Sequence, residues 1–425
     1  MSSLRDLTTT SDYDPNSMPV EKARAHIHAF LSPVTAVERL HIRACLGRVL
    51  AEDVISPINV PQHDNSAMDG YAVRFADLKT DGETALKIIG TAFAGKPFDG
   101  KLSPGQAVRI MTGAVIPMGT DTVIQQERAR SSRDAASGDQ VAVMPVPAKG
   151  TNTRRAGEDL RAGEAALKRG QAVHPAEIGM MASLGIGEVA VYRKLRVAFF
   201  STGDELTAIG TPLGPGQIYD SNRYTIHGLL MRLGCEVLDM GVIRDTPEAV
   251  ERAFQDAAQA ADVVITSGGV SVGEADYVKQ VLDRLGEVLF WKIAMKPGRP
   301  LAYGKIGHAH FFGLPGNPVA VMVTFYQFVR EALLHLQGQT RVSPLATLKV
   351  LCTSPIKKAP GRTEFQRGIL SQDASGQWSV RTTGDQGSGI LSSMSQADCF
   401  IILSTDLGNL PAGAIVDVQL LEGLI

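Results

Sequence analysis

Cysteine is scarce in this sequence, and the cysteines that occur stand far apart. The chain has 4 of them, Cys45, Cys235, Cys352 and Cys399, each in apolar surroundings. No Cys-x-x-Cys pair occurs, which excludes the usual thiolate metal site, and the wide spacing disfavours a disulfide framework. The cysteine pattern therefore favours a reducing compartment.

A strong net charge, a long apolar run and a leader pattern are also missing. The net charge of −2 gives the chain no general attraction to nucleic acid or to an anionic membrane. No uninterrupted apolar run of about 18 residues is found, and the first residues lack the basic and apolar pattern of a cleavable signal. We therefore expect a cytoplasmic protein without nucleic-acid or membrane partners, in which any anion site is a local basic cluster.

The chain has the length and the turn content of a multidomain globular protein. Its 425 residues are too many for one core, and it contains 43 glycines and 22 prolines. Residues 1–17 are rich in Ser, Thr, Asp and Asn, which predicts a disordered lead-in. Helical patterns at 18–52 and 175–185 flank short apolar runs with glycine and proline turns at 86–143. This order predicts a helical domain with a small β domain inserted into it.

From residue 195 the pattern changes to strands that alternate with helices. Strands are predicted at 196–200, 236–242, 263–266, 288–293 and 311–314, with helices at 222–233, 247–254, 277–285 and 318–336. Asp245, Pro247 and Glu248 predict a capping box for the second of these helices. Repeated βα units predict a parallel sheet with helices on both faces, which binds ligands at the carboxyl ends of its strands.

The loop after the central predicted strand is a candidate anion site. It contains Ser267, Gly268, Gly269, Ser271 and Gly273. Backbone N–H groups and the dipole of the following helix can both face a ligand there, although the spacing matches neither common nucleotide motif. Glu274 and Asp276 stand where an anion would lie, and acids beside phosphates usually indicate a bridging divalent cation. Ordinary carboxylates at a helix N-terminus are the alternative interpretation.

Other loops at the same predicted sheet edge carry acids and cations together. They contain Glu205, Asp245, Lys292, Lys296, Arg299 and the turn Pro315, Gly316 and Asn317. Carboxylates suit Mg²⁺, and lysines suit a phosphate or another oxyanion. The combination predicts a site for an anhydride or phosphate ester whose charge is shared by a metal ion and lysines, which eases phosphorus–oxygen cleavage. Two solvated lysines at a strand edge are the alternative.

Short strands return after Gly338. Apolar runs at 347–352, 364–370, 378–382, 399–404 and 415–420 predict a C-terminal β-barrel or sandwich. Arg367 and the loop 383–388 are polar beside these strands. In the inserted domain, Asp69 lies in a dense loop of turn formers and Thr112 follows a predicted strand. For that loop, a network of ordinary Asx turns is the alternative to a site.

Several motifs in order along nearly the whole chain carry a resemblance. They are Asp-Asn-Ser-Ala-Met-Asp-Gly-Tyr at 64–71, Arg-Ile-Met-Thr-Gly at 109–113, Arg-Ala-Gly-Glu-Asp at 155–159, Ser-Thr-Gly-Asp-Glu at 201–205, the Gly-Gly loop at 267–276, Lys-Pro-Gly at 296–298, Gly-Leu-Pro-Gly-Asn-Pro at 313–318 and Phe-Gln-Arg-Gly at 365–368. In this combination the chain resembles the MoeA family of molybdopterin molybdenumtransferases, the bacterial counterparts of the gephyrin E domain. It departs from many relatives at Arg299, where they have lysine, and at Asp385, which adds a negative charge to its loop.

The resemblance implies an α/β multidomain fold. Its four domains would be a discontinuous helical linker domain at 18–58 and 148–192, an inserted small β domain at 59–147, an α/β molybdopterin-binding domain with a parallel sheet at 193–340 and a C-terminal β-barrel at 341–425. It also implies an elongated homodimer whose active site lies between the α/β domain of one subunit and the small β domain of the other.

The family's reaction takes adenylylated molybdopterin and molybdate, and releases molybdenum cofactor and AMP with Mg²⁺ assistance. The resemblance places catalytic positions at Asp69, Thr112, Glu205, Asp245, Asp276, Lys292, Lys296, Arg367 and Ser388, with Asp159 as an addition. It places cofactor-binding positions at Gly268, Gly269, Ser271, Pro315, Gly316 and Asn317. A molybdopterin adenylyltransferase and apo-molybdoenzymes or their chaperones would be partners.

The roles implied for these residues divide between two substrates and a metal. Glu205, Asp245 and Asp276 would hold Mg²⁺ and the phosphate end of the nucleotide, and Lys292 and Lys296 would attract molybdate. Asp69 and Thr112 would reach the site from the partner subunit. Arg367 and Ser388 would hold an oxyanion from the barrel side.

Two other functions fit parts of the sequence. A molybdopterin adenylyltransferase shares the α/β domain and its Gly-Gly loop, but the extra domains with Asp69 and Thr112 favour the molybdenumtransferase. A scaffold that binds pterin without turnover would not need Asp276, Lys292 and Lys296, which are all present. The sequence does not distinguish molybdate from tungstate, because both oxyanions would meet the same lysines.

Overall fold

The computed structural model describes residues 4–9, 13–134, 138–268 and 276–421. The chain forms two compact units. The larger comprises Met1–Ala51, Arg169–His174 and Ala190–Ile425, and the smaller comprises Glu52–Lys168 and Pro175–Val189. This division is coarser than the four predicted domains, whose boundaries stay a prediction.

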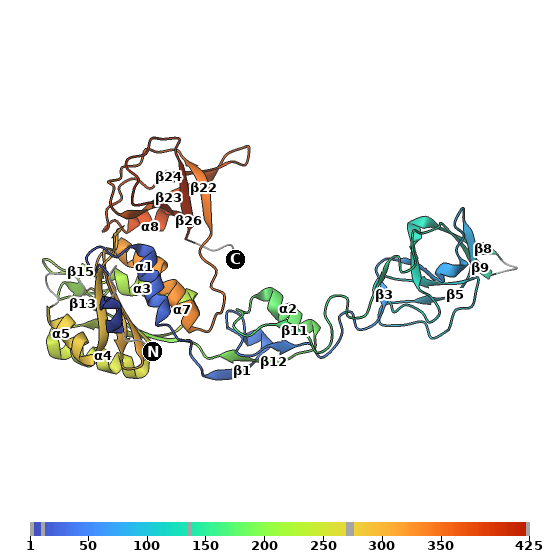
Figure 1. The fold of residues 1–425 in the computed structure, drawn as a ribbon, viewed down its shortest axis with the longest axis horizontal. Coiled ribbons are helices and arrows are strands. Elements are labelled where there is room, and N and C mark those ends of the chain that lie inside the picture. Colours follow the sequence, from blue (N-terminus) through green and yellow to red (C-terminus); the bar gives the residue numbers. More distant parts are fainter. Residues whose placement is uncertain (1–3, 10–12, 135–137, 269–275, 422–425) are drawn as a thin grey trace. The chain divides into compact units, whose positions relative to one another are not determined.

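A six-stranded sheet forms the centre of the larger unit (Figure 1). Its strands, in spatial order, are β16 (Glu236–Ile243), β13 (Arg196–Thr202), β17 (Val263–Ser267), β21 (Ala309–Leu314), β20 (Pro300–Ile306) and β18 (Gly286–Lys292). The first four run parallel, which confirms the predicted parallel core. The carboxyl ends of these four strands therefore lie at the same end of the sheet, and the loops that follow them lie side by side.

The sheet is mixed, because β20 runs antiparallel to both of its neighbours. This strand is missing from the sequence-based prediction. It returns directly into β21 through Gly307 and His308, with Gly307 at φ 58°. A connection of this length can join only antiparallel strands, since parallel strands need a crossover.

Helices cover both faces of the sheet (Figure 1). Along β13, Val197 and Phe199 belong to one core, together with α1 (Val20–Ala29), α3 (Ser221–Arg232) and the helix that begins at Pro318. Ala198 and Phe200 belong to a second core with α4 (Pro247–Ala260) and α5 (Asp276–Leu285). Successive side chains of a strand point to opposite faces, so the predicted three-layer α/β arrangement is confirmed.

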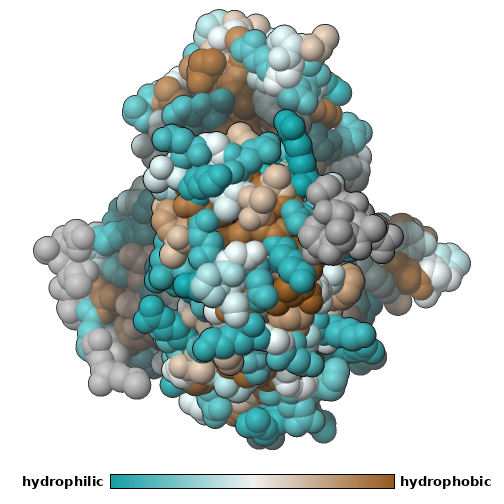
Figure 2. Space-filling view, turned by 90° about the vertical axis from the view of Figure 1, so that its right-hand side faces the viewer, coloured by the Kyte–Doolittle hydropathy of each residue, from teal (hydrophilic) through white to brown (hydrophobic). Residues whose placement is uncertain are grey.

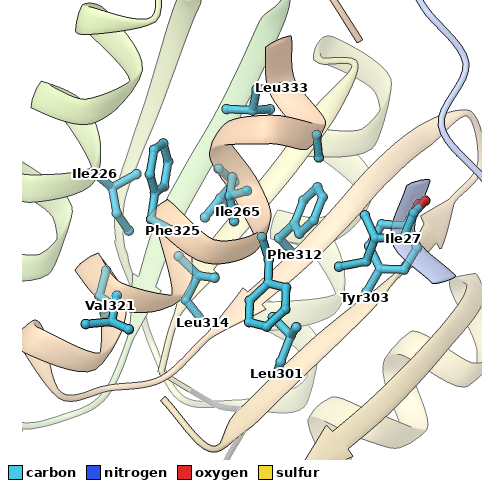
Figure 3. Close-up of a cluster of buried hydrophobic side chains, with 14 of the residues drawn as sticks. Ile27, Ile226, Ile265, Leu301, Tyr303, Phe312, Leu314, Val321, Phe325 and Leu333 are labelled. Carbon is cyan, nitrogen blue, oxygen red and sulfur yellow. The ribbon is translucent and has the colours of Figure 1, made fainter. Parts of the chain in front are cut away.

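One long helix runs through the first of these cores. It consists of α6 (Pro318–Thr324), the π-helical turn η5 (Phe325–Val329) and α7 (Arg330–Leu336). Its 19 residues have the length and composition of a membrane span, with a mean hydropathy of 1.3, but 72% of that window is buried inside the fold. Figure 3 shows Val321, Phe325 and Leu333 of this helix directed into the core that also holds Ile226. Such burial is that of a core helix.

The C-terminal part is a closed β-barrel, as predicted. Around the ring follow β23 (Thr363–Gln372), β24 (Trp378–Thr382), β22 (Thr347–Cys352), β26 (Ile415–Leu420) and β25 (Cys399–Leu403), and β25 pairs again with β23. The helical turn α8 (Ser392–Gln396) precedes β25. A short strand, β19 (Met295–Lys296), pairs in parallel with β23 and so joins the α/β part to the barrel.

The smaller unit is built on the predicted small β domain. A six-stranded sheet has the order β7 (Thr122–Gln125), β4 (Gly70–Val73), β6 (Gln106–Ile110), β5 (Thr84–Ala92), β9 (Gly138–Val143) and β8 (Ala129–Asp134). Beside it lie the pairs β3 (Asn65–Ser66) with β10 (Thr153–Arg154) and β2 (Val54–Ile55) with β11 (Ala165–Leu167), and α2 (Pro175–Ser183). Apolar side chains pack on both faces of the six-stranded sheet.

Both units have exposed apolar side chains. Figure 2 shows hydrophobic residues in small groups among hydrophilic ones on the face that it presents. The smaller unit contributes Met68, Phe93 and Met118, which are 42%, 49% and 69% exposed. Single exposed apolar residues are normal on soluble domains and do not define a docking surface.

Two local predictions near the N-terminus are wrong. Part of the predicted disordered lead-in forms a 3₁₀ helix, η1 (Leu4–Thr9), in which Leu4 is only 2% exposed. The helical pattern predicted over 18–52 holds only for α1, and its last part is reduced to η2 (Ile42–Ala44), which follows β1 (Val37–His41). Val49 and Leu50 instead form β-bridges with Ala172 and Val191, because long-range pairing overrides a weak local helix pattern.

Candidate active site

The larger unit contains a cleft of about 1190 Å³ between the carboxyl ends of its parallel strands and the barrel. Predicted site residues that line it are Glu205, Asp245, Gly268, Lys296, Pro315, Gly316, Asn317 and Ser388. Other lining residues include Arg299, Lys357, Gln366 and Gln386. This volume suits a nucleotide-sized ligand and far exceeds a single oxyanion.

The strand ends are tied together by Asn222, which follows the N-cap of α3. Its amide nitrogen donates to the Ser267 hydroxyl at 2.8 Å and to the Gly316 carbonyl at 2.6 Å. Gly268 then turns the chain with φ +90°, and a Cβ there would lie 2.9 Å from the Thr202 carbonyl oxygen. Only glycine therefore lets the backbone of this loop lie so close to β13.

Two of the three predicted metal carboxylates line the cleft. Glu205 follows β13 and Asp245 follows β16. The predicted capping box is wrong in detail, because Thr246 is the N-cap of α4 and its hydroxyl accepts from the Ala249 N–H at 3.4 Å. A threonine hydroxyl thus takes the capping role that the sequence pattern assigned to Asp245, and Asp245 itself lines the cleft.

The rest of the Gly-Gly loop lies outside the described residues. This applies to the predicted positions Gly269 and Ser271, and to Glu274; Asp276 begins α5, but its side chain is not described. Within the described part of the chain, no group of three His, Cys, Asp or Glu side chains is close enough to hold a metal ion. The oxygen donors that do line the cleft still fit Mg²⁺, which commonly takes one or two carboxylates and completes its shell with phosphate and water.

The two predicted lysines occupy different positions. Lys296 lies in β19 with 48% of its side chain exposed, and its ammonium is 3.6 Å from the Glu364 carboxylate. Lys292 is not among the described residues that line the cleft; its backbone is held by the N-terminal segment. Its N–H donates to the Pro15 carbonyl at 2.7 Å, and its carbonyl accepts from the Met18 N–H at 3.0 Å.

Arg367 supports a cleft loop from behind and does not line the cleft itself. Its side chain is fully buried. The guanidinium donates to the carbonyls of Asp385, Gln386 and Gly387 at 3.4, 3.1 and 2.9 Å, and to the Ser393 hydroxyl at 2.9 Å. Burial lowers the pKa of Arg367, and Asp385 opposes this effect. The predicted direct grip on an oxyanion is thus replaced in this structure by support of the loop that carries Ser388.

Ser388 lies where this barrel loop meets the long helix. Its carbonyl accepts from the Val319 N–H at 3.1 Å. Asn317, the N-cap of α6, and Ser388 both line the cleft. The barrel loop is therefore fastened both to Arg367 and to the first turn of the helix.

The remaining predicted residues belong to the smaller unit. Asp69 accepts from the Thr112 N–H at 2.7 Å and from its hydroxyl at 2.8 Å. These two bonds, the backbone one first, and the charge of Arg109 lower the pKa of Asp69. Asp159 lies in a turn, where its N–H donates to the Val60 carbonyl at 3.0 Å. The approach of Asp69 and Thr112 to the cleft of a partner subunit stays a prediction.

Sequence reasoning missed the cleft residues Lys357 and Gln366. It also missed Asn222, which ties the strand ends together, and Glu364, which contacts Lys296 and Gln366. Asn222 stands at the start of the helix predicted at 222–233, and Gln366 stands inside the motif at 365–368, but the sequence assigns neither residue a role in the site. The signal for Asn222 was its place at a helix N-terminus beside the carboxyl edge of the sheet. Glu364 had no local signal, since its importance depends on the pairing of two strands far apart in sequence.

Three family models match in order along the chain. They are the MoeA N-terminal region (domain I and II) over residues 18–185, a "Probable molybdopterin binding domain" over 198–335, and the MoeA C-terminal region (domain IV) over 349–421. Together they span the helical and small β parts, the α/β part and the barrel.

Relatives and solved structures agree with these models. The chain is 46% identical over 402 residues to the molybdopterin molybdenumtransferase of Haemophilus influenzae, covering 95% of this chain and 98% of that one. It is 36% identical over 373 residues to that of Nostoc sp., covering 86% and 84%. A solved structure of the molybdopterin biosynthesis MoeA protein of Pyrococcus horikoshii aligns with a TM-score of 0.76 at 32% identity, over 96% of this chain and 100% of that chain. The chain therefore belongs to the MoeA family of molybdopterin molybdenumtransferases.

Proposed function

We propose that this protein transfers molybdenum from molybdate to adenylylated molybdopterin and releases AMP. The observation that carries the proposal is the cleft at the carboxyl edge of the sheet, which presents Glu205 and Asp245 together with Lys296 and Arg299. Acids and cations in one cleft suit a substrate whose phosphates are shared between a metal ion and basic side chains. Across 95% of its length the chain matches a relative that bears the name of this activity.

The acids would hold Mg²⁺ against the phosphates of the substrate. Glu205 and Asp245 would supply carboxylate oxygens, with Asp276 as the third candidate at the start of α5. When bound, Mg²⁺ neutralises charge on the phosphate oxygens and so eases cleavage of the bond to AMP. The loops at Gly268 and at residues 315–317 would position the phosphates from the other side of the cleft.

The cations would bind the oxyanions. Lys296 and Arg299 line the cleft on either side of Pro297 and Gly298, so molybdate or a phosphate can meet two positive charges from one short turn. Lys292 would act in the same region from the end of β18, with its backbone fixed by the N-terminal segment. A cluster of this kind attracts molybdate and tungstate alike, because the charge and shape of the two ions are similar.

We also propose that the active protein is a cytoplasmic homodimer. Asp69 and Thr112 would then complete the cleft of the partner subunit. A molybdopterin adenylyltransferase would deliver the adenylylated substrate, and apo-molybdoenzymes or their chaperones would receive the product. Mixing two variants of reduced activity, Asp69→Asn and Asp245→Asn, at a low Mg²⁺ concentration tests the shared site: heterodimers regain activity if the residues act across subunits, and stay impaired if they act within one.

The decisive experiment measures AMP release by the full chain from adenylylated molybdopterin, with Mg²⁺ and with or without molybdate. We expect molybdate-dependent release of AMP and a product that activates an apo-molybdoenzyme. Tight pterin binding without AMP release would favour the scaffold. Adenylylation of molybdopterin from ATP would favour the adenylyltransferase.

A matched pair of variants tests the metal assignment. Asp245→Asn should raise the Mg²⁺ concentration needed for half-maximal activity by roughly tenfold, the usual size of a lost charged ligand. Asp417→Asn is the control, because Asp417 forms an exposed ion pair with Lys349 on the barrel. An unchanged Mg²⁺ dependence in Asp245→Asn would remove this residue from the metal site.

A further inference from the structure

We propose that Glu364 of the barrel is a positioning residue, which holds the ammonium of Lys296 in place for the oxyanion end of the substrate. The inference rests on the proposed function for its catalytic consequence. Its structural basis is the register of two strands from different parts of the larger unit. In the parallel pairing of β19 with β23, Lys296 lies directly opposite Glu364.

The two charged groups of this pair have very different surroundings. The side chain of Glu364 is only 4% exposed, whereas that of Lys296 is 48% exposed. The ammonium and carboxylate are 3.6 Å apart. A buried carboxylate is costly unless it is paired and hydrogen-bonded, so Glu364 requires its partners more than the exposed lysine does.

Gln366 fixes the orientation of that carboxylate. Its amide nitrogen donates to Glu364 Oε2 at 2.9 Å and to the Lys357 carbonyl at 2.9 Å. The other oxygen, Oε1, is the one that faces Lys296. The barrel thus holds one carboxylate oxygen with an amide and directs the second at the lysine that lines the cleft.

A purely architectural role explains this arrangement less well. The barrel is already joined to the α/β part by the backbone pairing of β19 with β23, including the bond from the Thr363 N–H to the Ala294 carbonyl at 2.9 Å. An ion pair with a half-exposed lysine adds little stability. A negative charge beside an anion site also weakens anion binding, so its benefit must come from where it holds the lysine.

Glu364→Gln separates the two roles, because it keeps the shape of the side chain and removes its charge. We expect kcat for molybdate-dependent AMP release to fall roughly tenfold to hundredfold, the usual effect of a misplaced catalytic group. KM for molybdate should stay unchanged or fall, since the cleft loses a repulsive charge. Glu364→Asp, which keeps the charge, should recover part of kcat. Asp417→Asn, on the same barrel, should leave both constants unchanged.

A second readout does not depend on activity. Reductive ¹³C-methylation of the lysines gives each one an NMR signal, and the signal of Lys296 is identified by its loss in Lys296→Arg. We expect this signal to move to the position of a freely rotating lysine in Glu364→Gln but not in Asp417→Asn. If the unmodified protein releases no AMP, the proposed function fails, while this signal still tests the position of Lys296.

Three results would overturn the inference. One is a Glu364→Gln variant with the kcat and KM of the unmodified protein. Another is an unchanged Lys296 signal in that variant. The third is a fall in Tm that accounts for the whole loss of activity, with kcat restored at lower temperature, which would make Glu364 a structural residue only. If Glu364→Gln does not fold, Glu364→Asp tests the same inference by distance, because its shorter side chain moves the carboxylate away from Lys296. A smaller loss of kcat and a smaller shift of the Lys296 signal are then expected, and unchanged values of both would overturn the inference.

Discussion

Asp69 and Thr112 form a two-bond contact in which both donors belong to one residue. The Thr112 N–H and hydroxyl donate to the same carboxylate oxygen, at 2.7 and 2.8 Å. Both residues are exposed in the smaller unit. Because hydrogen bonds to the charged form favour it, the contact keeps Asp69 ionised at lower pH than an ordinary aspartate.

Thr112→Val should raise the pKa of Asp69 toward its ordinary value without reaching it. The substitution removes the hydroxyl bond but keeps the backbone bond, which is the larger cause of the lowered pKa. Because the pKa of Asp69 is lower in the folded than in the unfolded protein, its ionised form stabilises the fold. This stabilisation is present above the unfolded pKa of about 3.9 and is lost as pH falls through the lower pKa of the folded state. ¹³C NMR titration of labelled aspartates, with the Asp69 signal assigned by Asp69→Asn, measures the change.

Asp373 provides an internal control for this titration. Its pKa is also lowered, by Ser375 and the neighbouring backbone of the barrel. Its titration should not change in Thr112→Val. An Asp69 titration identical to that of the unmodified protein would show that the hydroxyl bond is absent in solution.

Arg367→Lys should destabilise the barrel loop although it keeps the positive charge. Lysine has no planar fork, so it cannot serve the three carbonyls and the Ser393 hydroxyl that the guanidinium contacts. Leaving these partly buried carbonyls without the guanidinium costs about 1–3 kcal/mol, which should appear as a lower Tm. Arg381→Lys on β24, where the arginine is exposed, should leave Tm nearly unchanged.

The same variant distinguishes support of the loop from direct binding of the substrate. If Arg367 acts through the loop, activity falls together with Tm. Tungstate binding then weakens only to the extent that the loop around Ser388 loses its folded conformation. Weaker tungstate binding at an unchanged Tm, measured by calorimetry, would instead indicate that Arg367 contacts the oxyanion directly, as the resemblance implied.

The sequence predicted the elements of the site better than the way in which they meet. Strand ends with polar loops are local patterns, so Glu205, Asp245 and Gly268 could be predicted to share one sheet edge. The pairing of Lys296 with Glu364 could not, because it depends on the register of β19 against a barrel strand distant in sequence. The contacts of Arg367 with the loop that carries Ser388 could not be predicted either, because a motif shows that an arginine is present but not that it is buried. Long-range register and burial are decided by packing, which no local pattern contains.

His310 should make the larger unit less stable as pH falls from about 6.5 to 4. It is 5% exposed on β21, and its Nδ1 is 3.3 Å from the Tyr303 hydroxyl. Burial, aided by Lys305 and opposed by Asp262, lowers the pKa of His310 to about 4. The unfolded chain binds this proton at about pH 6.5, whereas the folded chain binds it only near pH 4. The free energy of unfolding therefore falls by about 3 kcal/mol between these two pH values, and His310 does not change it above pH 6.5.

Replacing this histidine should flatten the pH dependence. Urea unfolding of His310→Gln between pH 4.5 and 7.5 should show a smaller decline than that of the unmodified protein. His308→Gln in the neighbouring exposed turn is the control and should keep the full decline. An equal pH dependence in His310→Gln and the unmodified protein would mean that other groups account for it.

Gly298→Ala should be more damaging than the same change at a glycine with similar backbone angles. Gly298 has φ +94°, and an added Cβ would lie 2.6 Å from Thr324 Oγ1 and 3.1 Å from Met295 Cε. Gly361 has φ +101°, and none of the described atoms would lie within 4 Å of an added Cβ. Alanine should therefore cost about 1–2 kcal/mol at Gly361, from the left-handed backbone alone, and about 1–3 kcal/mol more at Gly298, from overpacking.

The clash at Gly298 can be relieved from the other side. Thr324→Ala removes Oγ1, a buried atom that has no hydrogen-bond partner among the described residues, so the double variant should recover part of the lost stability. Because Gly298 follows the turn that carries Lys296, AMP release should fall in Gly298→Ala and rise again in the double variant, while Gly361→Ala stays active. Equal losses of Tm in Gly298→Ala and Gly361→Ala would show that the turn at Gly298 adapts to the added methyl group. The same follows if the double variant recovers neither stability nor activity. In either case, the close packing of this turn against the long helix does not position Lys296.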